Sequence, residues 1–471
     1  MAITLVIVLL VVATLAFHFV SPWWFTPLAS NWQAIDDTIN ISLWVTGVVF
    51  VLVNLFLAYA IYKFRFDNNR RAEYQPENKK LENWLTLLTA IGVAAMLIPG
   101  LFVWAEIISP PANSRTVEVV GQQWHWTYRF PGEDGRLGKT ALELVDESNP
   151  FGLDPTDPYS QDDRLIQSNE LHLPIDQPIK LILRSKDVLH NFAVPQFRVK
   201  MDLVPGIASY VWFTPNRVGR YDILCEELCG VAHFTMRGRV IVESEADFID
   251  WLHTYPTYSQ LATAPVPDLA VGKGYYSGCI ACHGASGEGN TSMNAPSLAG
   301  IGAWYLERQL QYFKDKVRGG PDADEFAQQM AAMAILLPDH NAIRAVSHYI
   351  SRLPAAKLES PATTKGDPIK GRILYINCAH CHGANAQGNY ATNAPRLSSQ
   401  YPWYLKRQLQ SYRDGRRGGH LRDAYGSQMQ LMSRVLQDDK SIDDVVQYIS
   451  SLHDVNSRVG KLAKMAGAAN D

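Results

Sequence analysis

The six cysteines of this chain form three close pairs, and the spacing within each pair could support metal or cofactor binding. The first pair is Cys225 and Cys229, in the stretch CEELCGVAHFTM, which also holds His233 and Met236. Zinc takes four tetrahedral ligands, often from paired cysteines, whereas the soft thioether of methionine suits copper better. Two thiolates at this spacing could be shared between two metal ions. The stretch therefore predicts a copper site rather than a zinc site or a disulfide.

A copper site of this kind needs a second histidine from elsewhere in the chain. The sequence DVLHNFAVP supplies His190, about 35 residues before Cys225, at the end of an expected strand. Histidine and cysteine ligands with a weak axial methionine, carried on a β-sandwich, are typical of electron-transfer copper. We therefore expect His190 to join the cluster.

The other two cysteine pairs are each followed at once by a histidine. They are CIACH (Cys279, Cys282, His283) and CAHCH (Cys378, Cys381, His382). This is the attachment signature of c-type haem, in which two thioether bonds hold the porphyrin and the histidine is the proximal iron ligand. Since all six thiols are then used, none remains for a structural disulfide.

The two haem motifs belong to one module that occurs twice. Residues 272–353 and 371–452 align without a gap at a constant offset of 99, so that YLERQLQ matches YLKRQLQ. A repeat this regular indicates tandem duplication. Apolar residues at helical spacing predict that each copy is a short all-α domain built around its haem.

The modules resemble class I cytochromes c, and that resemblance suggests the sixth iron ligand. The position of a following leucine, Leu337 or Leu436, selects Met330 in the first copy and Met429 in the second. The alternatives, one helical turn later, are Met333 and Met432. Methionine and histidine ligation raises the haem potential, which suits a carrier that passes electrons to a strong oxidant.

The segment that holds the copper ligands has the pattern of a β domain. Short runs rich in Val, Trp and Tyr alternate apolar and polar residues, with Pro-Gly turns between them, as in a β-sandwich or barrel. The runs are 115–130, 179–184, 208–213 and 237–242. The acid-rich stretch 146–163 is expected to be a solvated insertion loop, with a calcium site as the weaker alternative.

Three apolar segments precede the β domain, at residues 1–20, 41–64 and 85–108. Each is close to the ~20 residues that a membrane helix requires. The loop between the last two carries six basic residues, which places it in the cytoplasm and the chain after Pro110 outside. The first segment lacks the basic flank of a secretory signal, so either a third, uncleaved helix or a cleaved signal fits.

The expected fold is therefore composite: a transmembrane helical hairpin with a third helix or a signal before it, an all-β cupredoxin Greek-key domain, and two all-α cytochrome c domains. The boundaries are 1–109 for the membrane part, 110–255 for the copper domain, 256–271 for a linker, 272–354 and 369–455 for the modules, 355–368 for a second linker, and 456–471 for a tail. Residues 110–270 carry a net charge of −8 and residues 366–471 carry +5. This asymmetry could favour transient docking at low salt.

Together with GQQWHW and VKMDLVPG, these motifs resemble subunit II of the haem-copper cytochrome c oxidases over residues ~35–250, in a caa-type version with two haem c modules. The resemblance implies a binuclear CuA centre. Its implied ligands are Cys225 and Cys229 as bridges, His190 and His233 as caps, Met236 as a weak ligand and Glu227 through its backbone carbonyl. The resemblance also implies that the Glu227 side chain lies beside a Mg²⁺ site shared with subunit I, and that electrons pass into CuA through Trp124.

One further residue follows from the resemblance less directly. Glu82, in LENWLT, resembles a glutamate at a proton-uptake entrance, although the tryptophan here is one residue early. The alternative is an interfacial carboxylate that is simply solvated.

The resemblance implies a subunit that passes electrons from two haems c through CuA to subunit I, where O₂ is reduced to water and protons are pumped. Its partners would be subunits I and III, the membrane, and a donor such as cytochrome c or a bc-type or alternative complex, with no nucleic acid. The soluble domains would lie on the periplasmic side of a bacterial cytoplasmic membrane. Alternatives are a nitric oxide or nitrous oxide reductase protein, or a copper storage or assembly protein. Glu227 and the hairpin favour the oxidase over the nitrous oxide enzyme.

Overall fold

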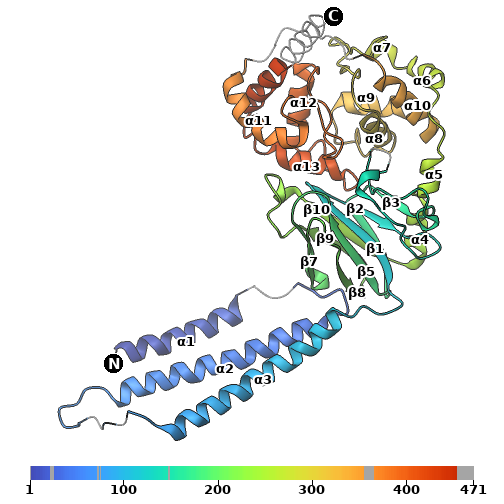
Figure 1. The fold of residues 1–471 in the computed structure, drawn as a ribbon. Coiled ribbons are helices and arrows are strands. Elements are labelled where there is room, and N and C mark those ends of the chain that lie inside the picture. The colour runs from blue at the N-terminus through green and yellow to red at the C-terminus, as the bar shows by residue number, and fades with distance from the viewer. Residues whose placement is uncertain are drawn as a thin grey trace, which may run out of the picture.

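The computed structural model describes residues 2–21, 26–71, 74, 76–146, 149–354 and 365–452. Figure 1 shows three parts that follow one another in space: a group of long helices, a β domain, and a cap of short helices. The chain runs through the three parts in this order, so the expected composite fold is confirmed.

The long helices are α1 (Ala2–Val20), α2 (Gln33–Lys63) and α3 (Lys79–Ile107). All three are long and apolar enough to cross a membrane. Most of their apolar side chains point outward, as expected of helices whose solvent is lipid. Helices α2 and α3 begin before the predicted segments, because polar turns at Gln33 and Lys79 extend each helix beyond its apolar run. The first apolar segment is helical, which both predictions for it allow.

The β domain consists of two five-stranded sheets, in the orders β3-β2-β1-β5-β8 and β4-β10-β9-β6-β7. The strands are β1 (Arg115–Gln122), β2 (His125–Phe130), β3 (Arg164–Ile166), β4 (Glu170–Pro174), β5 (Ile179–Ser185), β6 (His190–Val194), β7 (Val199–Leu203), β8 (Ser209–Phe213), β9 (Gly219–Leu224) and β10 (Arg237–Glu243). Large side chains such as Trp126, Tyr128 and Phe192 fill the core. The four predicted runs are confirmed as strands, with 115–130 forming a hairpin of two.

The acid-rich stretch 146–163 is less solvated than expected. Asp163 is fully buried and pairs with the guanidinium of Arg129, which also binds Glu118. Asp157 caps the short helix η2 (Pro158–Ser160) and accepts a hydrogen bond from the Lys139 amide. These carboxylates hold the loop on the domain, so the prediction of a solvated loop was wrong for this part of it. Among the described residues, no group of potential calcium ligands is found there.

The predicted linker 256–271 is also partly folded. After α4 (Glu245–His253), residues Tyr258–Ala262 form the short helix α5. The Tyr258 side chain is buried in a small cluster with Phe151 and Leu165 of the β domain. Only the later part of the segment therefore connects the two domains freely. Residues 355–364 of the second predicted linker and 453–471 of the predicted tail lie outside the described residues.

The cap consists of the two modules, whose helices follow the same order, except that the single helix α11 of module 2 covers the positions of both α6 and α7 of module 1. Module 1 contains α6 (Leu269–Tyr276), α7 (Ile280–His283), α8 (Ala303–Lys314), α9 (Glu325–Ala334) and α10 (His340–Ser351). Module 2 contains α11 (Pro368–His382), α12 (Pro402–Arg413), α13 (Ala424–Ser433) and a helical stretch at 439–452. Gly272 and Gly371 hold the same place in the two copies. A Cβ on either would overlap a backbone carbonyl of the last helix, so both positions require glycine for the close helix contact.

The two modules pack against each other through reciprocal contacts. The Arg308 guanidinium donates to the Asn393 side chain, and Arg407, its equivalent in module 2, donates to Asn294, the equivalent of Asn393. In the same way, Arg318 donates to Gln408 and Arg417 donates to Gln309. Since each contact recurs with the copies exchanged, the interface has the pattern of an isologous, two-fold contact.

A buried ion pair fastens the β domain to the membrane helices. Arg198 donates two hydrogen bonds to the Asp36 carboxylate near the start of α2, with Nε–Oδ1 and Nη2–Oδ2 distances of 2.6 and 2.8 Å. Beside this pair, the Trp32 indole donates to the carbonyl oxygen of Trp212, whose own indole donates to that of Glu106 at the end of α3. Both helices of the hairpin are thus joined to the sheet β3-β2-β1-β5-β8.

Replacing Asp36 with Ala is expected to loosen this junction, because it removes the carboxylate that pairs with the Arg198 guanidinium and leaves that charge with only the neutral acceptors of Thr26 and Pro195. Local stability should fall by about 2–3 kcal/mol. Hydrogen exchange of residues 26–36 and 195–198 in the detergent-solubilised protein would measure the loss. Asp37→Ala, at the exposed neighbouring position, is the matched control, and removing Arg198 as well should restore part of the protection. Equal exchange in the Asp36 and Asp37 variants would contradict the assignment.

Candidate copper and haem sites

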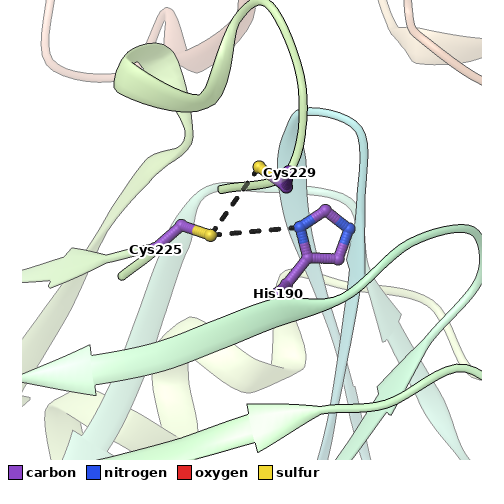
Figure 2. A group of neighbouring side chains, drawn as sticks. All are labelled: His190, Cys225 and Cys229. Carbon is purple, nitrogen blue, oxygen red and sulfur yellow. Dashed lines mark hydrogen bonds between the residues drawn. The ribbon is translucent and has the colours of Figure 1, made fainter. Parts of the chain in front are cut away.

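Two thiols and an imidazole converge at one end of the β domain (Figure 2). Cys225 directly follows β9, Cys229 lies in the loop after it, and His190 is the first residue of β6 rather than the last residue of a strand. The two Sγ atoms are 3.8 Å apart, and Nδ1 of His190 lies 3.9 Å from Sγ of Cys225. Among the described residues, this is the group of His, Cys, Asp and Glu that could hold a metal ion.

The remaining predicted ligands lie around the same two sulfurs. The short helix η4 (His233–Thr235) brings Nδ1 of His233 to 3.4 Å from Sγ of Cys229 and is followed by Met236, whose Sδ lies 3.8 Å from the same sulfur. The Glu227 carbonyl oxygen lies 3.3 Å from Sγ of Cys225. The structure therefore brings all six predicted residues together. Soft sulfur and imidazole donors at this spacing fit copper.

The two thiols share one hydrogen bond in the absence of metal. That bond lowers the pKa of Cys225 and raises the pKa of Cys229, so the pair holds one proton between two sulfurs. Nε2 of His190 lies 2.8 Å from a carboxylate oxygen of Asp187, which orients the ring so that Nδ1 faces the sulfurs. A carboxylate behind a ligating imidazole is a common second layer of metal sites.

Trp124 connects this cluster with module 2. Its indole Nε1 donates to the carbonyl oxygen of Cys229 at 3.1 Å, and its side chain is 4% exposed. On the other side, the amide of Gln428 donates to the Trp124 carbonyl oxygen, and the ring of His380 meets the indole edge-to-face at a centroid distance of 6.4 Å. Trp124 is thus covered by module 2.

Other contacts between the copper domain and module 2 are also made by neutral groups. His125 lies 3.2 Å from the Asn393 amide and packs edge-to-face on Tyr425, while Gln122 donates to the Ala391 carbonyl oxygen. Cys381 and Met432 pack against the core of the β domain. These contacts between the copper domain and module 2 therefore do not show the charge attraction that was expected from the acidic domain and the basic module.

Each module presents its haem-binding residues to a cavity that is continuous between the two copies. The cavity is lined by Cys279, Cys282, His283, Met330, Cys378, Cys381, His382 and Met429. In both copies Nδ1 of the motif histidine bonds a proline carbonyl oxygen, at 2.9 Å for His283 and 2.8 Å for His382. Burial lowers the pKa of both imidazoles, which keeps them neutral, and the bond at Nδ1 leaves Nε2 for iron. These residues fit a covalently bound haem c.

The structure keeps both methionines of each module near its cavity. Met330 and Met333 lie on α9, and Met429 and Met432 lie on α13. Met330 packs with Phe313 in a small cluster, whereas Met333 is 43% exposed. An exposed thioether is the poorer candidate for an axial ligand, so Met330 and its equivalent Met429 remain the predicted pair.

Comparisons with known proteins agree with these sites. The family described as "Cytochrome C oxidase subunit II, periplasmic domain" matches residues 115–244, and the family described as "Cytochrome c" matches 269–354 and 369–453. The "Alternative cytochrome c oxidase subunit 2" of Bradyrhizobium diazoefficiens is 52% identical over 262 residues, covering 56% of this chain and 95% of that relative. This chain belongs to the cytochrome c oxidase subunit II family.

More distant relatives extend the comparison. The "Cytochrome c oxidase subunit 2" of Cereibacter sphaeroides is 29% identical over 264 residues, which cover 51% of this chain and 82% of that one. The solved structure of reduced recombinant cytochrome c4 from Pseudomonas stutzeri matches 40% of this chain and 100% of that chain, at 28% identity and with a TM-score of 0.32. This subunit II is a membrane-anchored component of a haem-copper oxidase, an oxidoreductase, and its domains indicate copper and haem c.

Two glutamates of this subunit II have structural roles beside the predicted ones. Glu82 accepts a hydrogen bond from the amide of Asn78, whose side chain in turn caps α3 by accepting from the Leu81 amide. Its carboxylate thus stabilises a helix start, which agrees with the alternative interpretation and leaves the proton-uptake role a prediction. Glu226 pairs with Lys200 at 3.0 Å.

The residues that sequence reasoning missed lie at the contact between the subunit II copper domain and module 2. They are His125, His380, Asn393, Tyr425 and Gln428. One signal was available. Inside the duplicated haem motif, His380 replaces Ala281 of the other copy, and a difference between copies at a motif position marks a residue with a role in one copy only.

Replacing Met330 with Leu, and separately Met429 with Leu, should each remove the methionine ligand of one haem in subunit II. The weak long-wavelength absorption band of methionine-ligated ferric haem should then fall by about half in each variant, and the potential of the affected haem should drop. Met333→Leu and Met432→Leu are the matched controls and should keep the full band. A full band in the Met330 variant together with a loss in the Met333 variant would reverse the assignment.

The contact around His125 should weaken as the pH falls. Burial, followed by the positive charges of Lys186 and Arg308, lowers the pKa of His125 to about 3, while Asp187 opposes this shift and His190 adds to it. Because an exposed histidine titrates near 6.5, the opened form binds a proton that the closed form excludes, and below about pH 6.5 closure loses up to ~1.4 kcal/mol per pH unit. The protection factors of the amides of residues 389–394, which are already corrected for the pH dependence of intrinsic exchange, should fall between pH 7 and pH 5. His125→Gln should remove this pH dependence of protection, and an unchanged dependence in that variant would contradict the role of His125.

Proposed function

We propose that this subunit accepts electrons in its two cytochrome c modules and delivers them through its copper domain to subunit I of a terminal cytochrome c oxidase. There O₂ is reduced to water and protons are pumped. The observation that carries this proposal is the arrangement around Trp124, whose indole bonds the Cys229 carbonyl oxygen on one face while module 2 covers the other. Membership of the subunit II family supports it.

The copper domain is proposed to hold a binuclear CuA centre. Cys225 and Cys229 bridge the two ions, His190 and His233 cap one ion each, Met236 is a weak ligand, and Glu227 contributes its carbonyl oxygen. The convergence of these six residues supports the set. When bound, CuA and the haems c supply one-electron transfer without bond making or breaking. The residues of the chain would hold these centres in place and exclude water from them. They also fix the contact at Trp124 between the copper domain and module 2.

The modules are proposed to bind haem c at Cys279, Cys282 and His283, and at Cys378, Cys381 and His382, with Met330 and Met429 as the sixth ligands. Fusing them to the copper domain makes electron delivery intramolecular, so its rate depends on the effective concentration set by the connecting chain. The folded helix α5 shortens the free part of that chain. This favours the contact seen at Trp124 over wide excursions of the cap.

The remaining expectations belong to the same proposal. The Glu227 side chain is proposed to lie beside a Mg²⁺ ion shared with subunit I, and Glu82 at a proton-uptake entrance. Subunits I and III would contact the membrane helices, and the soluble domains would face the periplasm of a bacterial cytoplasmic membrane. The donor would be cytochrome c or a bc-type or alternative complex. The basic loop between α2 and α3 and the haem attachment motifs support this orientation.

Cys229→Ser tests the proposal, because it removes a bridging thiolate while leaving the modules untouched. In the purified complex, copper should fall from about three atoms per two haems c, two of them in CuA and one in the haem-copper site of subunit I, to about one, and haem c reduced without oxygen should then stay reduced when O₂ is admitted. Wild type should reoxidise its haem c and consume O₂, with haem a co-purifying. Metal analysis and rapid-mixing absorbance of haem c are the measurements.

The control is Glu226→Gln, which lies in the same loop but bonds Lys200 away from the sulfurs. It should keep its copper and reoxidise haem c as wild type does. Rapid reoxidation in a copper-depleted Cys229 variant would show that electrons leave by another route. If the wild-type complex consumed nitric oxide instead of O₂, the proposed function would have to change from oxidase to nitric oxide reductase.

A further inference from the structure

The two modules are copies of each other, but their surroundings differ. The contacts with the copper domain described above come from module 2, through His380, Cys381, Asn393, Tyr425 and Gln428. These residues surround the edge of the module 2 haem cavity at which the motif cysteine lies. In module 2, therefore, the part of this face around Cys381 and Met432 is occupied by the partner to which electrons are to pass, whereas Val435 beside it stays exposed.

The same face of module 1 is exposed. The equivalents of Thr392, Met432 and Val435 are Met293, Met333 and Leu336, which lie 99 positions earlier. Their side chains are 46%, 43% and 70% exposed, and all three line the cavity that also holds Cys282. We call Met293, Met333 and Leu336 the module 1 rim. An exposed apolar group beside a functional cavity is the usual mark of a binding surface.

The chemistry of the rim differs from that of its copy. The three segments that hold the rim residues and the haem motif, residues 275–283, 290–301 and 326–338, contain no Asp, Glu, Lys or Arg, although Arg308, Arg318 and Asp324 line the cavity from outside these segments. The equivalent segments of module 2 contain Arg396 and Arg434. At the rim, moreover, Met293 stands where module 2 has Thr392. The exposed face of module 1 is thus more apolar at its rim than the equivalent face of module 2, and the three segments that hold it are less charged.

The cavities of the two modules are joined, since His283 and His382 line one continuous space. The reciprocal contacts of Arg308 and Arg407 hold the copies in a fixed relation. Module 2 is therefore in contact with both the copper domain and module 1. Among the described residues, the module 1 rim is an exposed apolar edge of this pair.

We propose that the module 1 rim is the docking surface for the external electron donor, a small protein whose redox centre reaches the surface within an apolar, uncharged patch. This deepens the proposed function and rests on it. Electrons then pass in the order donor, module 1, module 2, copper domain. Each docking event oxidises the donor by one electron and reduces the chain by one, and no bond is made or broken. Since few charges border the rim, docking depends little on ionic strength.

The test measures binding and does not depend on turnover. The probe is a zinc-substituted blue-copper protein with an uncharged apolar patch at its metal site, which binds without transferring an electron. Surface plasmon resonance on the immobilised, detergent-solubilised complex gives its dissociation constant. Leu336→Glu should weaken binding by about tenfold or more, as expected for a charge placed in an apolar contact. Leu336→Asn, which removes the apolar group without adding charge, should weaken it in the same direction.

The matched control is Val435→Glu, the same substitution at the equivalent, exposed position of module 2. It should leave binding within about twofold, and wild-type binding should change by less than about twofold between low and high salt. The haem c absorption spectrum verifies that every variant is folded and loaded. Equal losses in the Leu336 and Val435 variants, or steep salt dependence, would overturn the proposal. So would sedimentation showing that wild type self-associates and that Leu336→Glu does not, because the rim would then bind a second copy.

The outcome also separates this proposal from the one on which it rests. If the probe binds at the rim but the complex takes up no O₂ with a chemical reductant, the docking surface stands and the oxidase function falls. If O₂ uptake is present and the probe binds the Leu336 variants as tightly as wild type, the oxidase function stands and the docking surface falls.

Discussion

Two buried thiols, with their sulfurs 3.8 Å apart, impose the constraint that the rest of this subunit has to meet. Two thiolates at that distance repel each other strongly in a medium of low dielectric constant, and without metal one proton has to lie between them. The loop after β9 and the first residue of β6 must therefore be held in place before any metal binds. The two sheets do this, because β6 pairs with β9 and both are anchored in the common core.

The same requirement explains how the surrounding parts are attached. A site whose geometry is fixed by a rigid β domain needs a membrane anchor that does not distort it. The linked indoles of Trp32 and Trp212 join the helices to the sheet β3-β2-β1-β5-β8, whereas Arg198 directly precedes β7 of the sheet that carries β6 and β9. Module 2 meets the β domain at Trp124 and at η4, the short helix that begins with His233. The predicted metal ligands thus lie beside the attachment of module 2.

The features of this arrangement that could be predicted are those that depend on residues close together in the sequence. The cysteine motifs, the exact repeat and the apolar segments are local patterns. The two modules and the transmembrane hairpin were predicted from them, the first helix was one of two interpretations, and the full set of copper ligands came from the family resemblance and stays a prediction. The folded loop around Asp163 and the folded linker around Tyr258 were not predicted, since acid-rich and Pro-rich stretches look solvated until a distant partner such as Arg129 or Phe151 is known. The contact between Trp124 and His380 joins residues more than 250 positions apart, and no spacing rule could pair them.

The reciprocal interface between the modules has a consequence for the length of the relay. In an isologous contact each surface pairs with its own copy, so two copies saturate it. Arg308 and Arg407 have already taken the asparagines that a further module would require. A repeat that stacked head to tail could have been extended by another duplication, as solenoid proteins are. This one is closed at two, and a longer chain of haems would need a different surface to grow from.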